Sequence, residues 1–161
     1  PYCVCRIAHC ALRIAHRELR IANCERPSHI PLASRAMSSI LVVADEPWIL
    51  TDVRAALGEA RYTITEINDP RAVAEAVIAD PPDAVIVDFQ VGSMGGMAVT
   101  RAVRDAFAGS EHSAPPVILL LDRDADAFLA GRSGAAAWVR KPFSSGDLRR
   151  AIDDSIAAPA A

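Results

Sequence analysis

The chain after residue 37 alternates short apolar segments with longer segments whose apolar residues recur every three or four positions. Strands that are apolar on both faces belong in the middle of a parallel sheet covered by helices, whereas an alternating strand suits an edge. Three apolar runs contain no alternating polar residues, whereas in a fourth run apolar and polar residues alternate. The pattern therefore predicts central strands at 40–43, 84–87 and 117–121, an edge strand at 63–67, and a weaker fifth strand at 136–139.

Between these predicted strands, apolar residues recur at the spacing of an α-helix. Asp69 before Pro70, and Ser144 three residues before Asp147, are helix-start signals, and a short alanine-rich helix is expected near 123–131. Five strands alternating with five helices predict an α/β, doubly wound parallel sheet, whose functional crevice lies beyond the carboxyl ends of the central strands. The three clearest helical stripes are Ile49, Val53 and Leu57; Val99, Val103 and Phe107; and Leu148, Ile152 and Ile156.

The first 36 residues differ in composition from the remainder. They carry six arginines and two glutamates, a net charge of +4, whereas residues 37–161 carry a net charge of −7. The triplet Arg-Ile-Ala recurs three times at intervals of seven, but its apolar offsets do not build a coiled-coil seam. We expect 1–36 to be a repeat-containing extension, disordered or translated from DNA upstream of a natural start at Met37, and 37–161 to form one domain.

Charge, hydropathy and cysteine usage exclude several classes of function. An acidic domain gives no reason to expect nucleic-acid binding. No apolar run approaches the roughly 20 residues of a membrane span, so we expect a soluble protein with no membrane partner. The domain itself has no cysteine, as is usual for a cytoplasmic protein. Known zinc spacings are absent among the only cysteines and their neighbouring histidines, which are Cys3, Cys5, His9, Cys10, His16 and Cys24.

Acidic residues and the only lysine follow the predicted central strands. Asp45 and Asp88 end the first and third strands, Leu121-Asp122 ends the fourth, and Lys141 follows the fifth. Two carboxylates at adjacent strand ends can bind a hard cation such as Mg²⁺, and aspartate can accept a phosphoryl group. A single aspartate there is more simply a helix cap or loop residue, but two acids and one lysine at the same edge indicate a site.

Three motifs carry a resemblance to a known family. Residues 40–47, ILVVADEP, resemble the I-L-V-V-D-D-E-P opening of response-regulator receiver domains. Residues 88–96, DFQVGSMGG, resemble D-x-M-M-P-G-M-D-G, and residues 134–143, GAAAWVRKPF, are similar to G-A-D-D-Y-L-T-K-P-F. The resemblance covers about 120 residues and implies a flavodoxin-like, five-stranded parallel sheet of order 2-1-3-4-5 with five helices, as in chemotaxis regulators.

The resemblance implies roles for five positions. Asp88 would be the phosphoacceptor, and Asp45, Asp88 and the backbone carbonyl of Gln90 would bind Mg²⁺. Lys141 would contact the phosphoryl oxygens, and Pro142 would follow a cis peptide bond. Together these residues imply a phosphoryl-accepting site.

Two positions depart from the family pattern. Ala44 replaces the first acid of the pair, so we expect weak Mg²⁺ binding. Leu121 replaces the Ser or Thr whose hydroxyl binds the phosphoryl group, so we expect the conformational response to phosphorylation to be impaired. Trp138 takes the place of the switch aromatic. Trp138 is equally well explained as a cover for the end of the sheet. Trp48, three residues after Asp45, should lie near the metal pocket.

The sequence thus predicts a stand-alone receiver of bacterial two-component signalling, not an enzyme. It would take a phosphoryl group onto Asp88 from a sensor histidine kinase or phosphotransfer protein and act on a downstream protein target. The alternative is a degenerate receiver that binds partners without phosphorylation, which Ala44 and Leu121 favour. A phosphatase of the haloacid dehalogenase kind would need an aspartate where Gln90 stands.

Overall fold

The strands of the computed structural model form one parallel sheet. The structure describes residues 37–58, 60–92 and 94–158. Every pair of neighbouring strands is parallel, and the order is β2-β1-β3-β4-β5, as predicted. The strands are β1 (Ser38–Val43), β2 (Tyr62–Ile67), β3 (Ala84–Asp88), β4 (Val117–Leu121) and β5 (Ala137–Arg140).

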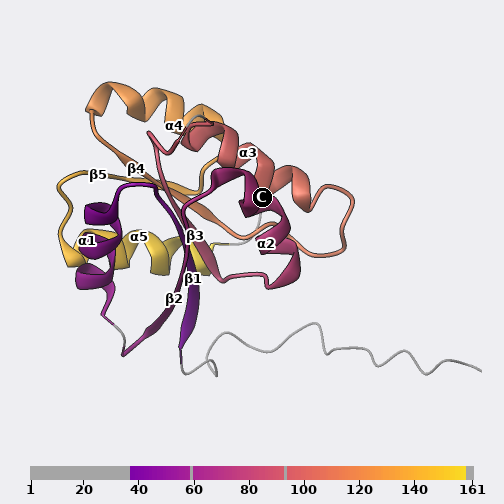
Figure 1. Cartoon of the computed structure of the whole chain (residues 1–161), viewed down its shortest axis with the longest axis horizontal. Helices are drawn as coiled ribbons and strands as arrows, with labels where there is room; N and C mark the ends of the chain where they lie inside the picture. The colour runs from indigo at the N-terminus through magenta and orange to yellow at the C-terminus, as the bar shows by residue number, and fades with distance from the viewer. Residues whose placement is uncertain (1–36, 59, 93, 159–161) are drawn as a thin grey trace, which may run out of the picture. The chain divides into compact units, whose positions relative to one another are not determined.

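Helices cover both faces of the sheet (Figure 1). The α1/α5 face packs against α1 (Pro47–Leu57) and α5 (Ser145–Ala157). The α2–α4 face packs against α2 (Val73–Ala79), α3 (Gly96–Ala106) and α4 (Ala127–Ser133). This is the doubly wound arrangement that the alternation of strands and helices predicts.

The burial of each strand explains its place in the sheet. All five residues of β3 and of β4 are buried, as expected for strands covered on both faces. The outer strand β2 alternates buried or half-buried residues with exposed ones, so its assignment to an edge is confirmed. The fifth strand lies at 137–140 and not at 136–139, one residue later than predicted.

Local capping fixes where helical segments begin. The side chain of Asp69 accepts a hydrogen bond from the Arg71 amide at the start of a 3₁₀ turn, η2 (Pro70–Ala72). Ser144 accepts one from the Asp147 amide at the start of α5. The helix predicted near 123–131 is divided into a 3₁₀ turn, η3 (Asp124–Asp126), and α4.

One group of predictions lies outside this description, and the expectation about membrane spans can be compared with the described helices. Those for residues 1–36, including the domain boundary and the cysteine and histidine residues, lie outside the described residues. None of the described helices is both long enough and apolar enough to cross a lipid bilayer.

Candidate functional site

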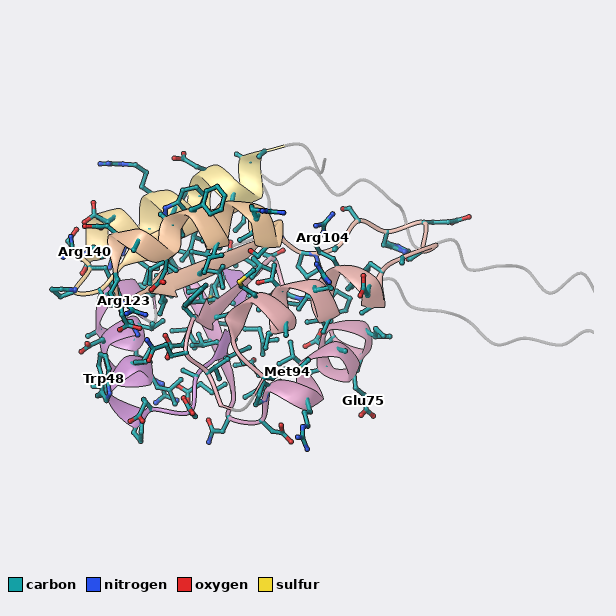
Figure 2. The ribbon with its side chains drawn as sticks, turned by 90° about the horizontal axis from the view of Figure 1, so that it is seen from above. Trp48, Glu75, Met94, Arg104, Arg123 and Arg140 are labelled. Carbon is teal, nitrogen blue, oxygen red and sulfur yellow. The ribbon has the colours of Figure 1, made fainter. Side chains whose placement is uncertain are left out.

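The register of the sheet brings four strand ends to one edge. Val43 of β1 is paired with Val87 of β3, so Ala44 and Asp88 come one residue later in each strand. Asp88 is paired with Leu120 of β4, and Leu121 is paired with Arg140 of β5. Figure 2 shows Trp48, Arg123 and Arg140, which lie at or just beyond three of these strand ends, at the same end of the molecule.

Alternation along the strands sorts the side chains at this edge onto two faces. Leu120 belongs to the core of the α1/α5 face, and its register partner Asp88 lies on that face too. Two residues after Leu120, Asp122 returns to the same face. Leu121 belongs to the core of the α2–α4 face. The strand end of β4 therefore presents Asp122, and not Leu121, on the side of Asp88.

Lys141 joins two of these strand ends through its ammonium group. Its Nζ lies 2.8 Å from Oδ1 of Asp88 and 2.9 Å from Oδ1 of Asp122. The side chains of Lys141 and Asp88 are 8% and 3% exposed, so this ion pair is buried. Nζ also lies 5.4 Å from the centroid of the Trp48 ring, within the range of a cation–π contact. Trp48 therefore lies beside Lys141, and its place near a metal pocket stays a prediction.

The two carboxylates keep Lys141 charged. Burial lowers the pKa of the ammonium, because the charged form loses hydration. The hydrogen bonds to Asp88 and Asp122, with the charges of both carboxylates, more than offset burial and hold the pKa above its usual value of 10.5. The site thus contains a fixed positive charge beside the predicted phosphoacceptor.

Asp45 contacts the loop that follows Asp88. Its Oδ2 accepts a hydrogen bond of 3.0 Å from the amide of Gly92, which has a φ of 47°. Gln90 lies within the turn closed by a 3.3 Å hydrogen bond from the Val91 amide to the Asp88 carbonyl. The three predicted metal ligands, Asp45, Asp88 and Gln90, therefore lie on β1 and β3 ends that a hydrogen bond ties together.

Gly96 fixes the backbone beneath Asp88. Its amide donates to the Phe89 carbonyl at 2.9 Å. A Cβ at this position would lie 2.7 Å from the Asp88 carbonyl oxygen and 2.9 Å from the Phe89 Cα. Only glycine permits so close an approach of α3 to the end of β3, so the match of Gly96 to the family motif has a steric reason.

The two departures from the family pattern are both buried and apolar. Ala44 is fully buried on the α1/α5 face. Leu121 is 1% exposed and packs with Ala130 of α4 among the residues of the α2–α4 core. Trp138 is 45% exposed on β5 and lies close to Gly131 of α4. Leu121 and Trp138 share a face, opposite to that of Asp88 and Lys141.

The donor atoms fit Mg²⁺ only with additional ligands. Among the described residues, no three acidic, histidine or cysteine side chains are grouped to hold a metal ion. Asp45 and Asp88 supply hard carboxylate oxygens of the type that Mg²⁺ prefers, and a carbonyl and water would have to complete its octahedron. The peptide bond between Lys141 and Pro142 is cis, as the resemblance implies.

Asp122 is a member of the site to which the sequence analysis assigned no role, although it placed this residue at the end of the fourth strand. It directly follows β4 and contacts Lys141, but the family motif directs attention to Leu121 beside it. The period of two along β4 could have found it, because Asp122 and the buried Leu120 share a face. Asp122 therefore belongs with Asp88 and Lys141 in any account of the site.

Comparisons with known proteins agree with this fold. Residues 40–153 match the response regulator receiver domain. The probable transcriptional regulatory protein TcrX of Mycobacterium tuberculosis is 33% identical over 108 residues, 66% of this chain and 44% of TcrX. The transcriptional regulatory protein KdpE of the same species is 31% identical over 127 residues, 76% of this chain and 54% of KdpE. The chain spans about half the length of these relatives.

Solved structures show the same fold. The receiver domain of the sensor histidine kinase PA1611 from Pseudomonas aeruginosa, which has a magnesium ion in its active-site cleft, is 25% identical. Its TM-score is 0.66, covering 76% of this chain and all of that domain. The chemotaxis regulator CheY4 of Vibrio cholerae has a TM-score of 0.62 at 23% identity, covering 74% of this chain and 98% of CheY4. The chain belongs to the response regulator receiver domain family.

Proposed function

We propose that this receiver domain accepts a phosphoryl group on Asp88 from a sensor histidine kinase or phosphotransfer protein. The observation that carries the proposal is the buried pair of Asp88 and Lys141, with 2.8 Å between Oδ1 and Nζ. The pair places a carboxylate nucleophile and a fixed cation together at the carboxyl edge of the sheet. Two-component signalling is the process in which the family acts, and the downstream protein target is part of the same proposal.

The chemistry requires little beyond positioning and charge neutralisation. A carboxylate oxygen of Asp88 attacks the phosphorus of a phosphohistidine, and a new P–O bond forms as the P–N bond breaks. The bonding electrons leave with the imidazole of the donor. Lys141 turns toward the phosphoryl oxygens, whose negative charge it is positioned to neutralise. The phosphoryl group then remains on Asp88 as an acyl phosphate.

Mg²⁺ is the proposed cofactor, held by Asp45, Asp88 and the carbonyl of Gln90. When bound, it supplies positive charge against the phosphoryl oxygens. We expect the affinity to be weak, because only two carboxylates contribute and Ala44 contributes none. The domain's own residues position the acceptor and keep Lys141 beside it.

The test is treatment with acetyl phosphate and Mg²⁺ followed by intact-mass analysis. The wild-type protein should gain one phosphoryl group, and Asp88→Asn should gain none. A parallel sample with a chelator in place of Mg²⁺ should gain the group more slowly. If the wild type never gains it at high Mg²⁺, phosphorylation of Asp88 is ruled out.

A second function is favoured by the burial of Leu121. Its side chain is packed in the α2–α4 core and offers no hydroxyl to a phosphoryl group. A domain that cannot respond to phosphorylation would act as a constitutive protein-interaction module. Such a module should bind its target equally well as the wild type and as Asp88→Asn, whereas a phosphorylation-dependent receiver should lose the phosphodonor effect in that variant.

A further inference from the structure

Lys141 is the only described cation within ion-pairing distance of either Asp88 or Asp122. The two carboxylates share it almost equally, at 2.8 Å and 2.9 Å. Asp88 is almost completely buried, and the Asp122 side chain is 34% exposed. One ammonium cannot fully balance two carboxylates, so this part of the site retains negative charge.

The second oxygen of Asp122 lacks a partner. Its Oδ2 is buried and accepts no hydrogen bond from any described residue. A buried carboxylate oxygen without a hydrogen bond destabilises the folded state. Its presence in a native structure therefore calls for an explanation, such as a function. Asp122 directly follows β4 and Asp45 follows β1, and the strand order places these two strands on opposite sides of β3, which ends at Asp88. The acceptor thus has one carboxylate on either side.

We propose that Asp122 is a specificity-determining residue of the phosphoryl site, and this rests on the proposed function. By holding Lys141 and adding a negative charge beside Asp88, it favours cations and disfavours phosphoryl anions. An arriving phosphoryl group must draw Lys141 away from Asp122 and then lie next to that carboxylate. Asp122 therefore limits how much of the domain is phosphorylated at a given donor concentration.

The proposal makes a prediction of opposite sign for two ligands. Removing the charge in Asp122→Asn should weaken Mg²⁺ binding about threefold to tenfold, because one attractive charge is lost. The same change should tighten binding of beryllofluoride, a phosphoryl mimic, about tenfold at saturating Mg²⁺. These sizes are expected for one charge at a few ångströms in a partly exposed pocket. A purely structural role of Asp122 would weaken both ligands.

The control is Asp124→Asn, two residues away in the same segment. Asp124 is exposed and pairs with Arg140 at 2.8 Å, outside the pocket. Mg²⁺ and beryllofluoride affinities are measured by calorimetry for wild type, Asp122→Asn, Asp122→Glu and Asp124→Asn, with a melting curve for each. Asp124→Asn should match the wild type, and Asp122→Glu, which keeps the charge, should lie closer to the wild type than Asp122→Asn.

The outcomes separate the two proposals. If the wild type is phosphorylated on Asp88 but Asp122→Asn changes neither affinity, or weakens both, the role of Asp122 is overturned and the proposed function stands. If Asp122→Asn takes a phosphoryl group and the wild type does not, Asp122 blocks the acceptor, which supports the role of Asp122 while the proposed function of the wild-type domain fails. If neither binds beryllofluoride nor gains a phosphoryl group, both proposals are wrong.

Discussion

On the two sides of Asp88, the neighbouring strands end in different ways. On the β1 side, Ala44 is buried and Asp45 is exposed, and among the described residues its side chain accepts one hydrogen bond, from the Gly92 amide. On the β4 and β5 side, Asp122 and Lys141 form a largely buried ionic cluster with Asp88. The carboxylate on the β1 side is thus open to water, whereas on the other side the Asp88–Lys141 pair is buried and only Asp122 is partly exposed.

This difference separates stability from ligand binding within one site. A buried ion pair is strongly destabilised when one partner is removed, because the remaining charge is left without compensation. An exposed carboxylate with one hydrogen bond contributes little to folding. We therefore expect substitutions on the Lys141 side to change the free energy of unfolding, and substitutions of Asp45 to change mainly metal affinity.

The largest effect should come from Lys141→Met. It leaves Asp88 and Asp122 without their shared cation, so the variant should lose about 3 kcal/mol of unfolding free energy at neutral pH. Asp88→Asn should lose much less, because Lys141 keeps Asp122 as a partner. Urea unfolding measures both. Arg140→Met is the matched control, an exposed pair with Asp124 that should contribute less than about 1 kcal/mol. Equal losses in Lys141→Met and Arg140→Met would contradict the comparison.

Leu121→Thr should have the next largest effect. The side chain is almost fully buried in the α2–α4 core, and threonine both loses apolar volume and introduces a hydroxyl there. The expected loss is about 2 kcal/mol in urea unfolding, at the lower end for truncation of a buried leucine. Leu129→Thr, at an exposed position of α4, should lose less than about 1 kcal/mol. An unchanged stability in Leu121→Thr would mean that position 121 tolerates the family's hydroxyl without penalty.

The sequence predicted the fold well because burial on both faces leaves a strong pattern. Continuous apolar runs such as 84–87 and 117–121 lie in the middle of the sheet, and the alternating run at 63–67 lies at its edge. The fifth strand has the weakest pattern, and its predicted position was wrong by one residue. That strand has only one buried residue, so hydrophobicity gives little information about where it starts.

The site was predicted less completely, for a different physical reason. Asp88 and Lys141 follow from strand ends and from the family motif, and the structure brings them together. The contact of Lys141 with Asp122 depends on which way a long side chain turns, and the contact of Asp45 with Gly92 depends on the path of a loop. Periodicity places Asp122 on the face of Asp88, but it encodes neither of these two contacts. The roles proposed for Asp45, Gln90, Trp138 and Leu121 remain predictions.

Asp45→Ala should have a small effect on stability and a larger one on metal binding. It removes one hydrogen bond at an exposed position, so the unfolding free energy should fall by about 1 kcal/mol or less. Mg²⁺ affinity, followed by Trp48 emission in a Trp138→Phe background, should fall at least tenfold, since one of two carboxylates is lost. A stability loss as large as that of Lys141→Met would show that the β1 side is not open in the way described.

Unfolding at high pH tests the Lys141 side of the site once the contribution of Tyr62, a second group with a raised pKa, is removed. Lys141 and Tyr62 both have a pKa raised above the usual value; for Tyr62 the causes are burial and then the charge of Asp153, to which its hydroxyl donates at 3.2 Å. A raised pKa gives stability that is present below the unfolded value, near 10, and is lost as pH rises through the folded value. Between pH 10 and the folded pKa values, the unfolding free energy of Tyr62→Phe should therefore fall less steeply with pH than that of the wild type, as measured by urea unfolding. An unchanged slope would show that Tyr62 titrates alike in both states.

The smallest expected response is that of Trp138 to a phosphoryl mimic. Trp138 lies on the face of Leu121, away from Asp88 and Lys141, and Leu121 has no hydroxyl to form a bond that would distinguish two positions of the ring. A ligand that interacts equally with both states shifts neither. In a Trp48→Phe variant, which leaves Trp138 as the only tryptophan, emission should stay nearly constant when beryllofluoride and Mg²⁺ are added. Leu121→Thr in that background should restore a response, provided that the variant remains folded. A strong response with Leu121 present would mean that another group carries the signal across the sheet.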